Sequence, residues 1–543
     1  MRNSLKVAVN RTGRTSYGLM LLLSALLLPR ALAVNVLIQH NDLARTGANT
    51  SETILTPANV NSTNFGQLFT DSVDGQVYAQ PLYVENLNLS GGTHNVVFVC
   101  TESNSVYAFD ADRGGATYWH VKLGTPYTPP SCGDLVPVVG ITGTPVIDLS
   151  SGTLYVDTKL AAGPAQALHA LDITTGNEKF GGPVTLATNN IFNASLEHQR
   201  PGLLLLNGVV YVCFGSHCDQ GSYHGFVLGF NATNLSQVLS FNVTATGSEG
   251  AIWSGGMAPA VDTNGNIYVM TGNGTFDGTN NFGESMIKLN SSLSVLDYAT
   301  PSNWSSLNSS DTDLGSGGPV LLPTHYVVGM GKDGKMYLAD INHMGHVGNF
   351  TQTFQAQSEG DTVGKSPVYW QGPNLQYIFA LHSNSQTKSF EFTGTNINST
   401  PLGTASFAQN DRCGGLSLSA NGTNNGILWE IGSDSNLRAY DAVNFPNLLW
   451  SGSVGTYVKM TCPTVANGKV YVGTSSNLGV WGLTNYLYIQ TGIAKPVLTW
   501  ATGTLLETTN LAGPWATNSA ASPYTVAPTN TQMFYRLLLP TGL

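Results

Sequence analysis

Four short segments of the chain repeat one pattern, a mostly apolar run that ends at Asp. They are Ser105–Asp110, Gln166–Asp172, Lys335–Asp340 and Asn436–Asp441. Each follows a Gly-bounded hydrophobic run rich in β-branched and aromatic residues. Self-similarity at a period of about 50 to 60 residues, built from such short runs, is typical of a β-propeller. The sequence therefore predicts an all-β fold in which a functional site lies near the propeller axis.

The composition agrees with this fold. Charged residues make up only 10% of the chain, so Asn, Ser, Thr and Gly must supply most of the polar surface. The 61 glycines and 25 prolines suit many tight turns and little helix. A net charge of −10 without a basic stripe argues against a nucleic-acid partner.

The first 33 residues have the features of a secretory signal peptide. Basic residues between Arg2 and Arg14 precede the apolar run Leu19–Leu28, and Ala31–Ala33 is a small-x-small cleavage site. We expect cleavage near Ala33, no transmembrane segment in the mature chain, and a secreted, periplasmic or cell-surface monomer. Six cysteines in an oxidising compartment can pair, but their irregular spacing leaves buried thiols equally open.

The hydrophobic runs group into eight blades. The predicted inner strands are rich in small residues that can crowd at the axis: Tyr78–Val84, Thr142–Asp148, Pro201–Leu206, Gly256–Asp262, Gly317–Leu322, Gly364–Trp370, Gly414–Ala420 and Cys462–Asn467. The eighth blade lacks an outer strand after Val480–Leu483, while Gly66–Val73 has no other partner. We expect these two segments to pair, because closure of the ring removes two free sheet edges.

Three further segments complete the predicted organisation. An N-terminal entry segment, 34–63, precedes the propeller, which spans about 64–484. After it the pattern changes, and residues 485–543 are predicted to form a small β-sandwich-like module. We expect this module to be an appendage or a surface-attachment element.

The blade repeats, with the segments Asn41–Asn49 and Leu55–Val60 before them, resemble the quinoprotein alcohol dehydrogenase family over about residues 38–484. Members of that family are eight-bladed propellers that carry pyrroloquinoline quinone (PQQ) and a metal ion on the axis. The resemblance implies PQQ with Ca²⁺ or a lanthanide as the cofactors, and oxidation of an alcohol or sugar as the activity.

The resemblance also implies roles for individual residues. Asn273 and Asp313 match metal ligands, and Asp311 matches the catalytic Asp that takes a proton from the substrate. Lys332 matches the cation that hydrogen-bonds the quinone, and Trp253 matches the Trp beneath it. Oxygen ligands suit a hard cation, so this assignment is chemically coherent. The same residues also suit ordinary turns, such as the Gly-Asn-Gly around Asn273.

The chain departs from the family pattern at two places. Ser131–Asp134 contains one cysteine, Cys132, where the family often has an adjacent Cys pair before Asp134. The family's Glu metal ligand is replaced by His217–Gln220, in which only Asp219 could serve. Both departures weaken the expected cofactor site.

Two other groups of polar residues are candidates for a binding site. Residues that lead into inner strands should line the mouth of the axial channel: Asp134, Lys365, Asp411, Arg412 and Lys459. A dense group on the third blade could bind a transition metal, although it lacks tetrahedral spacing: His198, Arg200, His217, Asp219 and His224.

Two classes of function remain open. We expect a secreted binding scaffold that holds a small molecule, glycan or protein at its mouth or rim, without PQQ-dependent oxidation of simple alcohols. The alternative is a quinoprotein oxidoreductase. Fold alone cannot choose between them, because function depends on the site.

Overall fold

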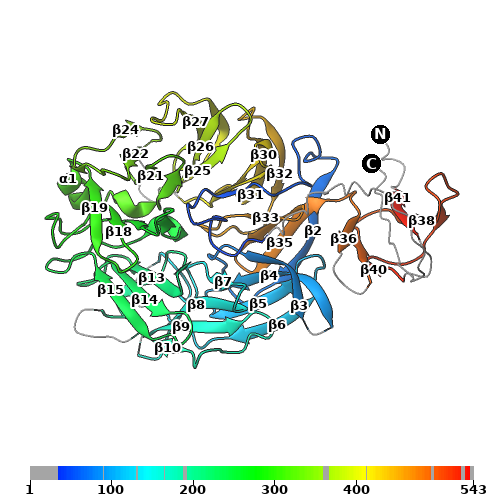
Figure 1. Ribbon diagram of the computed structural model, residues 1–543, viewed down its shortest axis with the longest axis horizontal. Helices are drawn as coiled ribbons and strands as arrows, with labels where there is room; N and C mark the ends of the chain where they lie inside the picture. Colours follow the sequence, from blue (N-terminus) through cyan, green and yellow to red (C-terminus); the bar gives the residue numbers. More distant parts are fainter. Residues whose placement is uncertain are drawn as a thin grey trace, which may run out of the picture.

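The computed structural model describes residues 35–538 except 90, 130–132, 164, 187–191, 359–365, 411, 491–494 and 528–531. Over this part of the chain, eight sheets of four principal strands surround a central axis (Figure 1), so the prediction of an all-β, eight-bladed propeller is confirmed. The predicted signal peptide, Cys132, Lys365 and Asp411 lie outside the described residues.

Blades 1 to 4 follow one another in chain order. Blade 1 contains β3 (Leu82–Leu89), β4 (Gly92–Cys100), β5 (Ser105–Asp110) and β6 (Thr117–Lys122). Blade 2 contains β7 (Val146–Asp148), β8 (Thr153–Leu160), β9 (Ala165–Asp172) and β10 (Val184–Thr185). Blade 3 contains β12 (Leu204–Leu206), β13 (Val209–Ser216), β14 (Phe226–Asn231) and β15 (Gln237–Asn242), with β11 (Glu197–His198) also paired to β13. Blade 4 contains β16 (Ala260–Val261), β17 (Ile267–Met270), β18 (Met286–Leu289) and β19 (Val295–Thr300).

Blades 5 to 8 complete the ring. Blade 5 contains β20 (Val320–Leu322), β21 (Tyr326–Met330), β22 (Lys335–Asp340) and β24 (Gln352–Gln355), while β23 (His346–Val347) pairs in parallel with β19 of blade 4. Blade 6 contains β25 (Val368–Gln371), β26 (Gln376–Ala380), β27 (Gln386–Phe392) and β28 (Gly403–Ala408). Blade 7 contains β29 (Leu416–Asn421), β30 (Asn424–Ile431), β31 (Asn436–Asp441) and β32 (Leu448–Ser453). Blade 8 contains β33 (Thr464–Ala466), β34 (Lys469–Gly473), β35 (Asn477–Leu483) and β2 (Phe65–Ser72).

The ring closes as predicted. Strand β2 runs antiparallel to β35, with Phe65 opposite Leu483 and Ser72 opposite Asn477. The last blade thus takes its outer strand from the N-terminal side of the propeller. Pairing residues so far apart in sequence removes two edges that would otherwise be exposed.

The repeated Asp has one structural role throughout. In blades 1, 2, 5 and 7 it ends the third strand and its Oδ1 accepts a hydrogen bond from the backbone N–H two residues later. The residues are Asp110, Asp172, Asp340 and Asp441. Such a turn reverses the chain toward the outer strand, which explains the spacing of the repeat.

The hydrophobic core lies between neighbouring blades. Separate clusters of buried side chains join blades 2 and 3, 3 and 4, 4 and 5, 5 and 6, 6 and 7, and 7 and 8, and one larger cluster spans blades 8, 1 and 2. Trp119 of β6 adds a polar link, because its Nε1 donates to the carbonyl of Ile173 in blade 2. Burial between all neighbours holds the loops of the axis in fixed positions.

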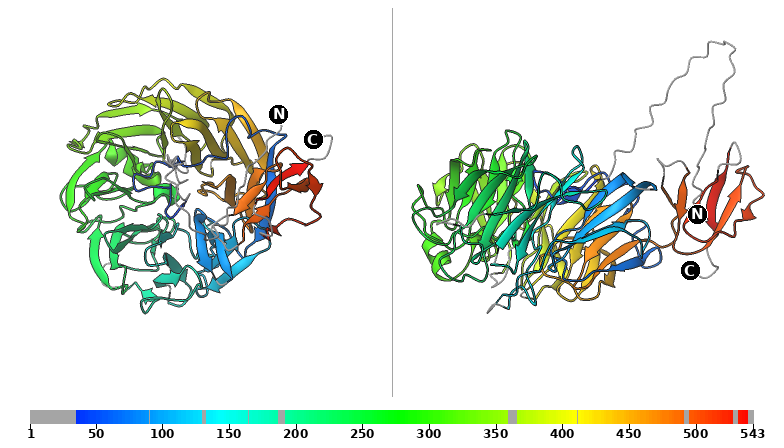
Figure 2. Two further views of the ribbon diagram at one scale, coloured as in Figure 1. Left: turned by 45° about the vertical axis from the view of Figure 1, so that its right-hand side comes forward. Right: turned by 90° about the horizontal axis from the view of Figure 1, so that it is seen from below.

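The entry segment forms a strap across the axis. It includes β1 (Ala48–Asn49), which pairs in parallel with β29. Its carbonyls accept backbone hydrogen bonds from inner-strand residues of blades 1, 2, 4, 5, 6 and 7: Tyr83, Ile147, Val261, Leu321, Tyr369 and Leu418. Figure 2 shows this dark blue segment crossing the centre of the ring. The strap therefore lies deeper along the axis than the loops that lead into the inner strands.

The described residues include three short helices, of which the first and third precede the inner strands β16 and β20, while the second lies at the outer edge of the ring (Figure 1). They are η1 (Ser254–Gly256), α1 (Trp304–Ser309) and η2 (Leu314–Ser316). In the described part of the chain, no helix is long and apolar enough to cross a membrane.

The C-terminal part is a separate small β module at the side of the ring (Figure 2). It has two three-stranded sheets and its own apolar cluster. The strands are β36 (Tyr488–Gln490), β37 (Val497–Thr499), β38 (Thr504–Thr508), β39 (Ala516–Thr517), β40 (Tyr524–Thr525) and β41 (Phe534–Leu538).

The described cysteines show that both of the states left open by the sequence occur. Four are buried free thiols, Cys100, Cys213, Cys413 and Cys462. Cys218 is disulfide-bonded.

Candidate functional site

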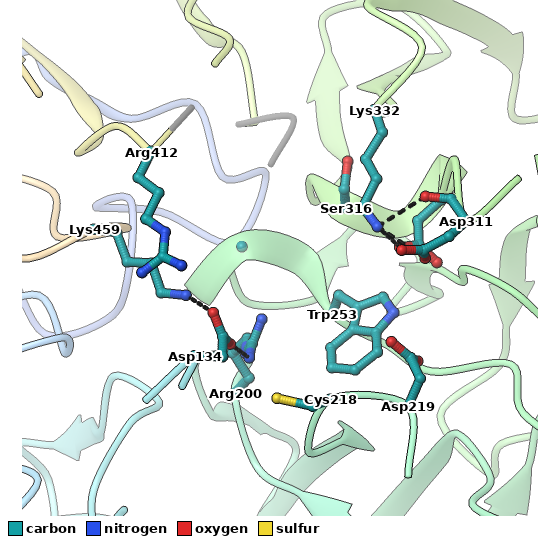
Figure 3. Close-up of a pocket in the computed structure, with 12 residues that line it drawn as sticks. Asp134, Arg200, Cys218, Asp219, Trp253, Asp311, Ser316, Lys332, Arg412 and Lys459 are labelled. Carbon is teal, nitrogen blue, oxygen red and sulfur yellow. Dashed lines mark hydrogen bonds and ion pairs between the residues drawn. The ribbon is translucent and has the colours of Figure 1, made fainter. Parts of the chain in front are cut away.

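A cavity of about 280 Å³ opens at the mouth of the axis (Figure 3). Its walls come from loops that lead into the inner strands of several blades, together with the turns after β13 and β21. The lining residues are Asp134, Arg200, Cys218, Asp219, Trp253, Gly255, Asp311, Asp313, Ser316, Lys332, Arg412 and Lys459. Inner strands begin a few residues later than predicted, because these preceding residues turn into the mouth instead of joining the sheets.

On one side of the cavity, a lysine neutralises two carboxylates. Lys332 Nζ lies 2.6 Å from Asp313 Oδ2 and 3.0 Å from Asp311 Oδ1. Asn273 donates its backbone N–H to Asp313 Oδ1 and its side-chain Nδ2 to Asp311 Oδ1. Gly272 allows this approach, since a Cβ there would collide with the Asp313 carboxylate. The structure thus brings together four of the residues singled out in the sequence, while their roles remain predictions.

The electrostatics of this group follow from the ion pairs. Burial alone would lower the pKa of Lys332, but the charges of Asp313 and Asp311 raise it above its usual value. Lys332 is therefore a fixed cation at every physiological pH. The side-chain oxygen of Asn273 is buried and has no hydrogen-bond partner among the described residues.

Asp219 and Trp253 also lie in the mouth. Burial raises the pKa of Asp219, and the nearby charges of Asp313 and Asp311 add to this, although a hydrogen bond from Tyr223 opposes the shift. The Tyr223 hydroxyl donates to Asp219 Oδ1 over 2.7 Å. We call Asp219, Asp311, Asp313 and Lys332 the acidic side of the mouth.

A second ion-pair group forms the opposite wall. Arg200 Nη2 donates to Asp134 Oδ2 over 2.7 Å, and Lys459 Nζ is hydrogen-bonded to Asp134 Oδ1. The guanidinium of Arg200 also stands 5.0 Å from the Trp253 ring centroid. Among the described residues, no carboxylate forms an ion pair with Arg412. Asp134, Arg200, Arg412 and Lys459 are called the cationic side.

This wall carries more positive charge than Asp134 neutralises. Burial would raise the pKa of Asp134, but Arg200 and Lys459 lower it well below its usual value. Burial, and then the charge of Arg200, lowers the pKa of Lys459 to about 8 despite its bond to Asp134. The expectation that Asp134, Arg412 and Lys459 line the mouth is met. The sequence pattern groups Arg200 with the histidines instead, although Arg200 also precedes an inner strand and lines the mouth.

The histidine group of blade 3 does not form a metal site. Among the described residues, no three His, Cys, Asp or Glu side chains converge as metal ligands would. His198 and His217 are buried, and neither ring nitrogen of either residue has a hydrogen-bond partner within the described part of the chain. Burial, with the charges of Lys159 and Arg200, keeps the pKa of each well below its usual value. Both imidazoles are neutral, and His224 Nδ1 bonds Thr244 Oγ1 instead.

The residues present fit a planar anion better than a metal ion. Trp253 and the cationic side match the flat, negatively charged PQQ. A metal ion on the acidic side would need about six to eight oxygen ligands. Two of the carboxylates there already bind Lys332, which occupies the position between them. Lys332, which the resemblance assigns to the quinone, therefore binds oxygen atoms that a metal ion would need.

The buried Glu102 behind the cationic side predicts a pH-dependent stability. It accepts hydrogen bonds from Gly140 N–H and Thr142 Oγ1, and burial raises its pKa to about 7. Between its unfolded pKa of about 4.5 and 7, the folded state binds more protons, so stability falls as pH rises. The loss should reach about 3 kcal/mol by pH 7.5. The test is the change in unfolding free energy between pH 5 and pH 7.5, which should be smaller in Glu102→Gln than in the wild type. If the change is the same in both proteins, the prediction is wrong.

Comparisons with known proteins give likenesses of structure only. No protein-family model and no curated protein matches the sequence. The quinohemoprotein alcohol dehydrogenase ADHIIG from Pseudomonas putida HK5 is similar, with a TM-score of 0.59, 15% identity, and coverage of 83% of this chain and 80% of that one. A europium-containing methanol dehydrogenase is similar with a TM-score of 0.60, 13% identity, and coverage of 83% and 98%.

BamB from Moraxella catarrhalis gives a weaker likeness, with a TM-score of 0.49, 14% identity, and coverage of 77% and 99%. At such low identities the comparisons describe architecture. The likeness to the two dehydrogenases shows that this chain has the eight-bladed β-propeller fold of the quinoprotein alcohol dehydrogenases.

Proposed function

We propose that the protein is a binding scaffold that holds a small anionic ligand in the axial mouth. The observation that carries this proposal is the cationic side, where Arg200 and Lys459 both pair with Asp134 and Arg412 adds a third cation. Arg200 and Lys459 are buried and Arg412 is exposed at the opening, so an anion that enters the mouth would gain charged hydrogen bonds from a wall with net positive charge. Trp253 offers an aromatic surface beside these cations.

Removing one cation tests the proposal. Arg412→Ala should weaken binding of a small carboxylate about 10- to 100-fold, because it deletes one charged hydrogen bond worth roughly 1.5–3 kcal/mol. The measurement is isothermal titration calorimetry with a panel of PQQ, citrate, glucuronate and cyclohexanecarboxylate. Arg113→Ala is the matched control, since Arg113 is exposed on blade 1. If no member of the panel binds the wild type, the proposal is wrong.

The pH dependence of binding gives an independent check. Lys459 has a pKa lowered to about 8, so it loses its charge as pH rises through that value. Affinity for a carboxylate probe should therefore fall between pH 7 and 9, and the fall should be smaller in Lys459→Met. An affinity that is constant over this range would show that Lys459 does not contact the ligand.

A quinoprotein oxidoreductase acting on an alcohol or sugar is the second candidate. It is favoured by the unpartnered oxygen of Asn273 beside Asp311 and Asp313, since these are the oxygens that a metal would use. Bound PQQ would supply the electron acceptor. Asp311 would hold the proton from the substrate hydroxyl, and Lys332 would have to leave both carboxylates. Dye-linked alcohol oxidation after reconstitution with PQQ and Ca²⁺ or Eu³⁺, lost in Asp311→Ala, would favour this candidate.

A further inference from the structure

The mouth carries opposite charge on its two sides, with Trp253 between them in Figure 3. The cationic side has three cations and one carboxylate, and the acidic side has three carboxylates and one cation. A ligand that fills the cavity must therefore satisfy two different walls. The chemical class of this ligand can be inferred only if the proposed binding function holds.

We infer that the ligand is a sugar acid, a single pyranose ring that carries a carboxylate. The carboxylate would lie against Arg412 and Lys459, which donate charged hydrogen bonds. Hydroxyl groups at the other end of the ring would donate to Asp311 and Asp219. The apolar C–H face of the ring would pack on the indole of Trp253. A cavity of about 280 Å³ suits one ring of this size.

Lys332 makes the acidic side selective for a ligand hydroxyl group over a ligand ammonium group. Its Nζ lies 3.0 Å from Asp311 Oδ1, so a group placed at Asp311 also meets this cation. A hydroxyl can donate to the carboxylate and accept from the ammonium at once, whereas a ligand ammonium can only donate and is repelled. The acidic side therefore favours a polyol over an amine.

A ligand that has only the hydroxyl groups or only the carboxylate leaves one side of the mouth without hydrogen-bond partners. A neutral sugar would displace water from the cationic side and return no negative charge. A carboxylate without hydroxyls would place apolar surface against Asp219 and Asp311. Both lose charged hydrogen bonds that a sugar acid makes.

Three ring compounds test the inference, measured by calorimetry with the mature chain at pH 7. Glucuronate has the ring, the hydroxyls and the carboxylate; glucose lacks the carboxylate, and cyclohexanecarboxylate lacks the hydroxyls. Glucuronate should bind at least about tenfold more tightly than either. Equal binding of cyclohexanecarboxylate, abolished by Arg412→Ala, would overturn the sugar-acid inference and leave the proposed function standing. Absence of binding by every carboxylate would overturn both.

A single variant separates the two sides of the mouth. Asp311→Asn keeps the shape of the side chain, and Asn tolerates the left-handed backbone that residue 311 adopts, with φ of 51°. Affinity for glucuronate should fall about tenfold, while affinity for cyclohexanecarboxylate should stay the same or rise. Arg412→Ala should weaken both compounds. A loss of the same size for both compounds in Asp311→Asn would contradict contact between Asp311 and the hydroxyls.

Discussion

Replacement of Arg45 by Ala is expected to lower the free energy of unfolding by about 3–5 kcal/mol. Arg45 belongs to the strap and is completely buried on the axis. Its Nε donates to the carbonyl of Pro259 and its Nη1 to that of Gln39, both over 2.8 Å. Truncation leaves a cavity and two buried carbonyls without donors, so two penalties act together. Urea denaturation followed by tryptophan fluorescence measures the change.

Two variants make the Arg45 result specific. Arg45→Met keeps most of the volume and removes a charge whose pKa burial lowers to about 10, so it should cost clearly less than Ala. Arg113→Ala, on the exposed surface, should change stability by no more than about 0.5 kcal/mol. If Arg45→Ala were as mild as Arg113→Ala, the strap would not be a stabilising part of the ring.

Lys332→Met is expected to destabilise the protein by about 3–5 kcal/mol, because it leaves a buried carboxylate unpaired. Asp313 has a side chain only 4% exposed and depends on Lys332 for charge compensation. The vacated position lies between the carboxylates of Asp311 and Asp313, whose oxygens are ligands that Ca²⁺ accepts. Millimolar Ca²⁺ should therefore raise the melting temperature of Lys332→Met and leave that of the wild type unchanged.

Lys122→Met is the matched control for this experiment. Lys122 Nζ lies 3.6 Å from Asp74 Oδ2, and the two side chains are 54% and 32% exposed, so the loss of this pair should cost at most about 1 kcal/mol and create no response to Ca²⁺. Stabilisation of the wild type by Ca²⁺ equal to that of the variant would show that Lys332 does not occupy the cation position. That result would favour the quinoprotein candidate.

The sequence by itself determined the propeller. The repeated Asp predicts a turn after the third strand, and each such Asp accepts the backbone hydrogen bond that the turn needs. The missing outer strand of the last blade predicted the closure between β2 and β35. These features are readable because they depend on local turn chemistry and on counting strands.

Part of the site could also be predicted, both from the family resemblance and from the expectation that residues leading into inner strands line the mouth. Asn273, Asp311, Asp313 and Lys332 lie together because turns before and after inner strands meet at one end of the axis. The rule that residues leading into inner strands reach the mouth also found Lys459. It did not reveal which charges would pair there.

Only the tertiary structure decided how the charges are divided. Asp134 is paired with Arg200 of blade 3 and with Lys459, which is 325 residues away in the chain. No local pattern encodes such a contact, because it depends on the angle at which the blades close the ring. The same holds for Arg45, which the strap carries to the carbonyl of Pro259, 214 residues away. Local sequence specifies each blade, but the electrostatics of the axis arise where all the blades meet.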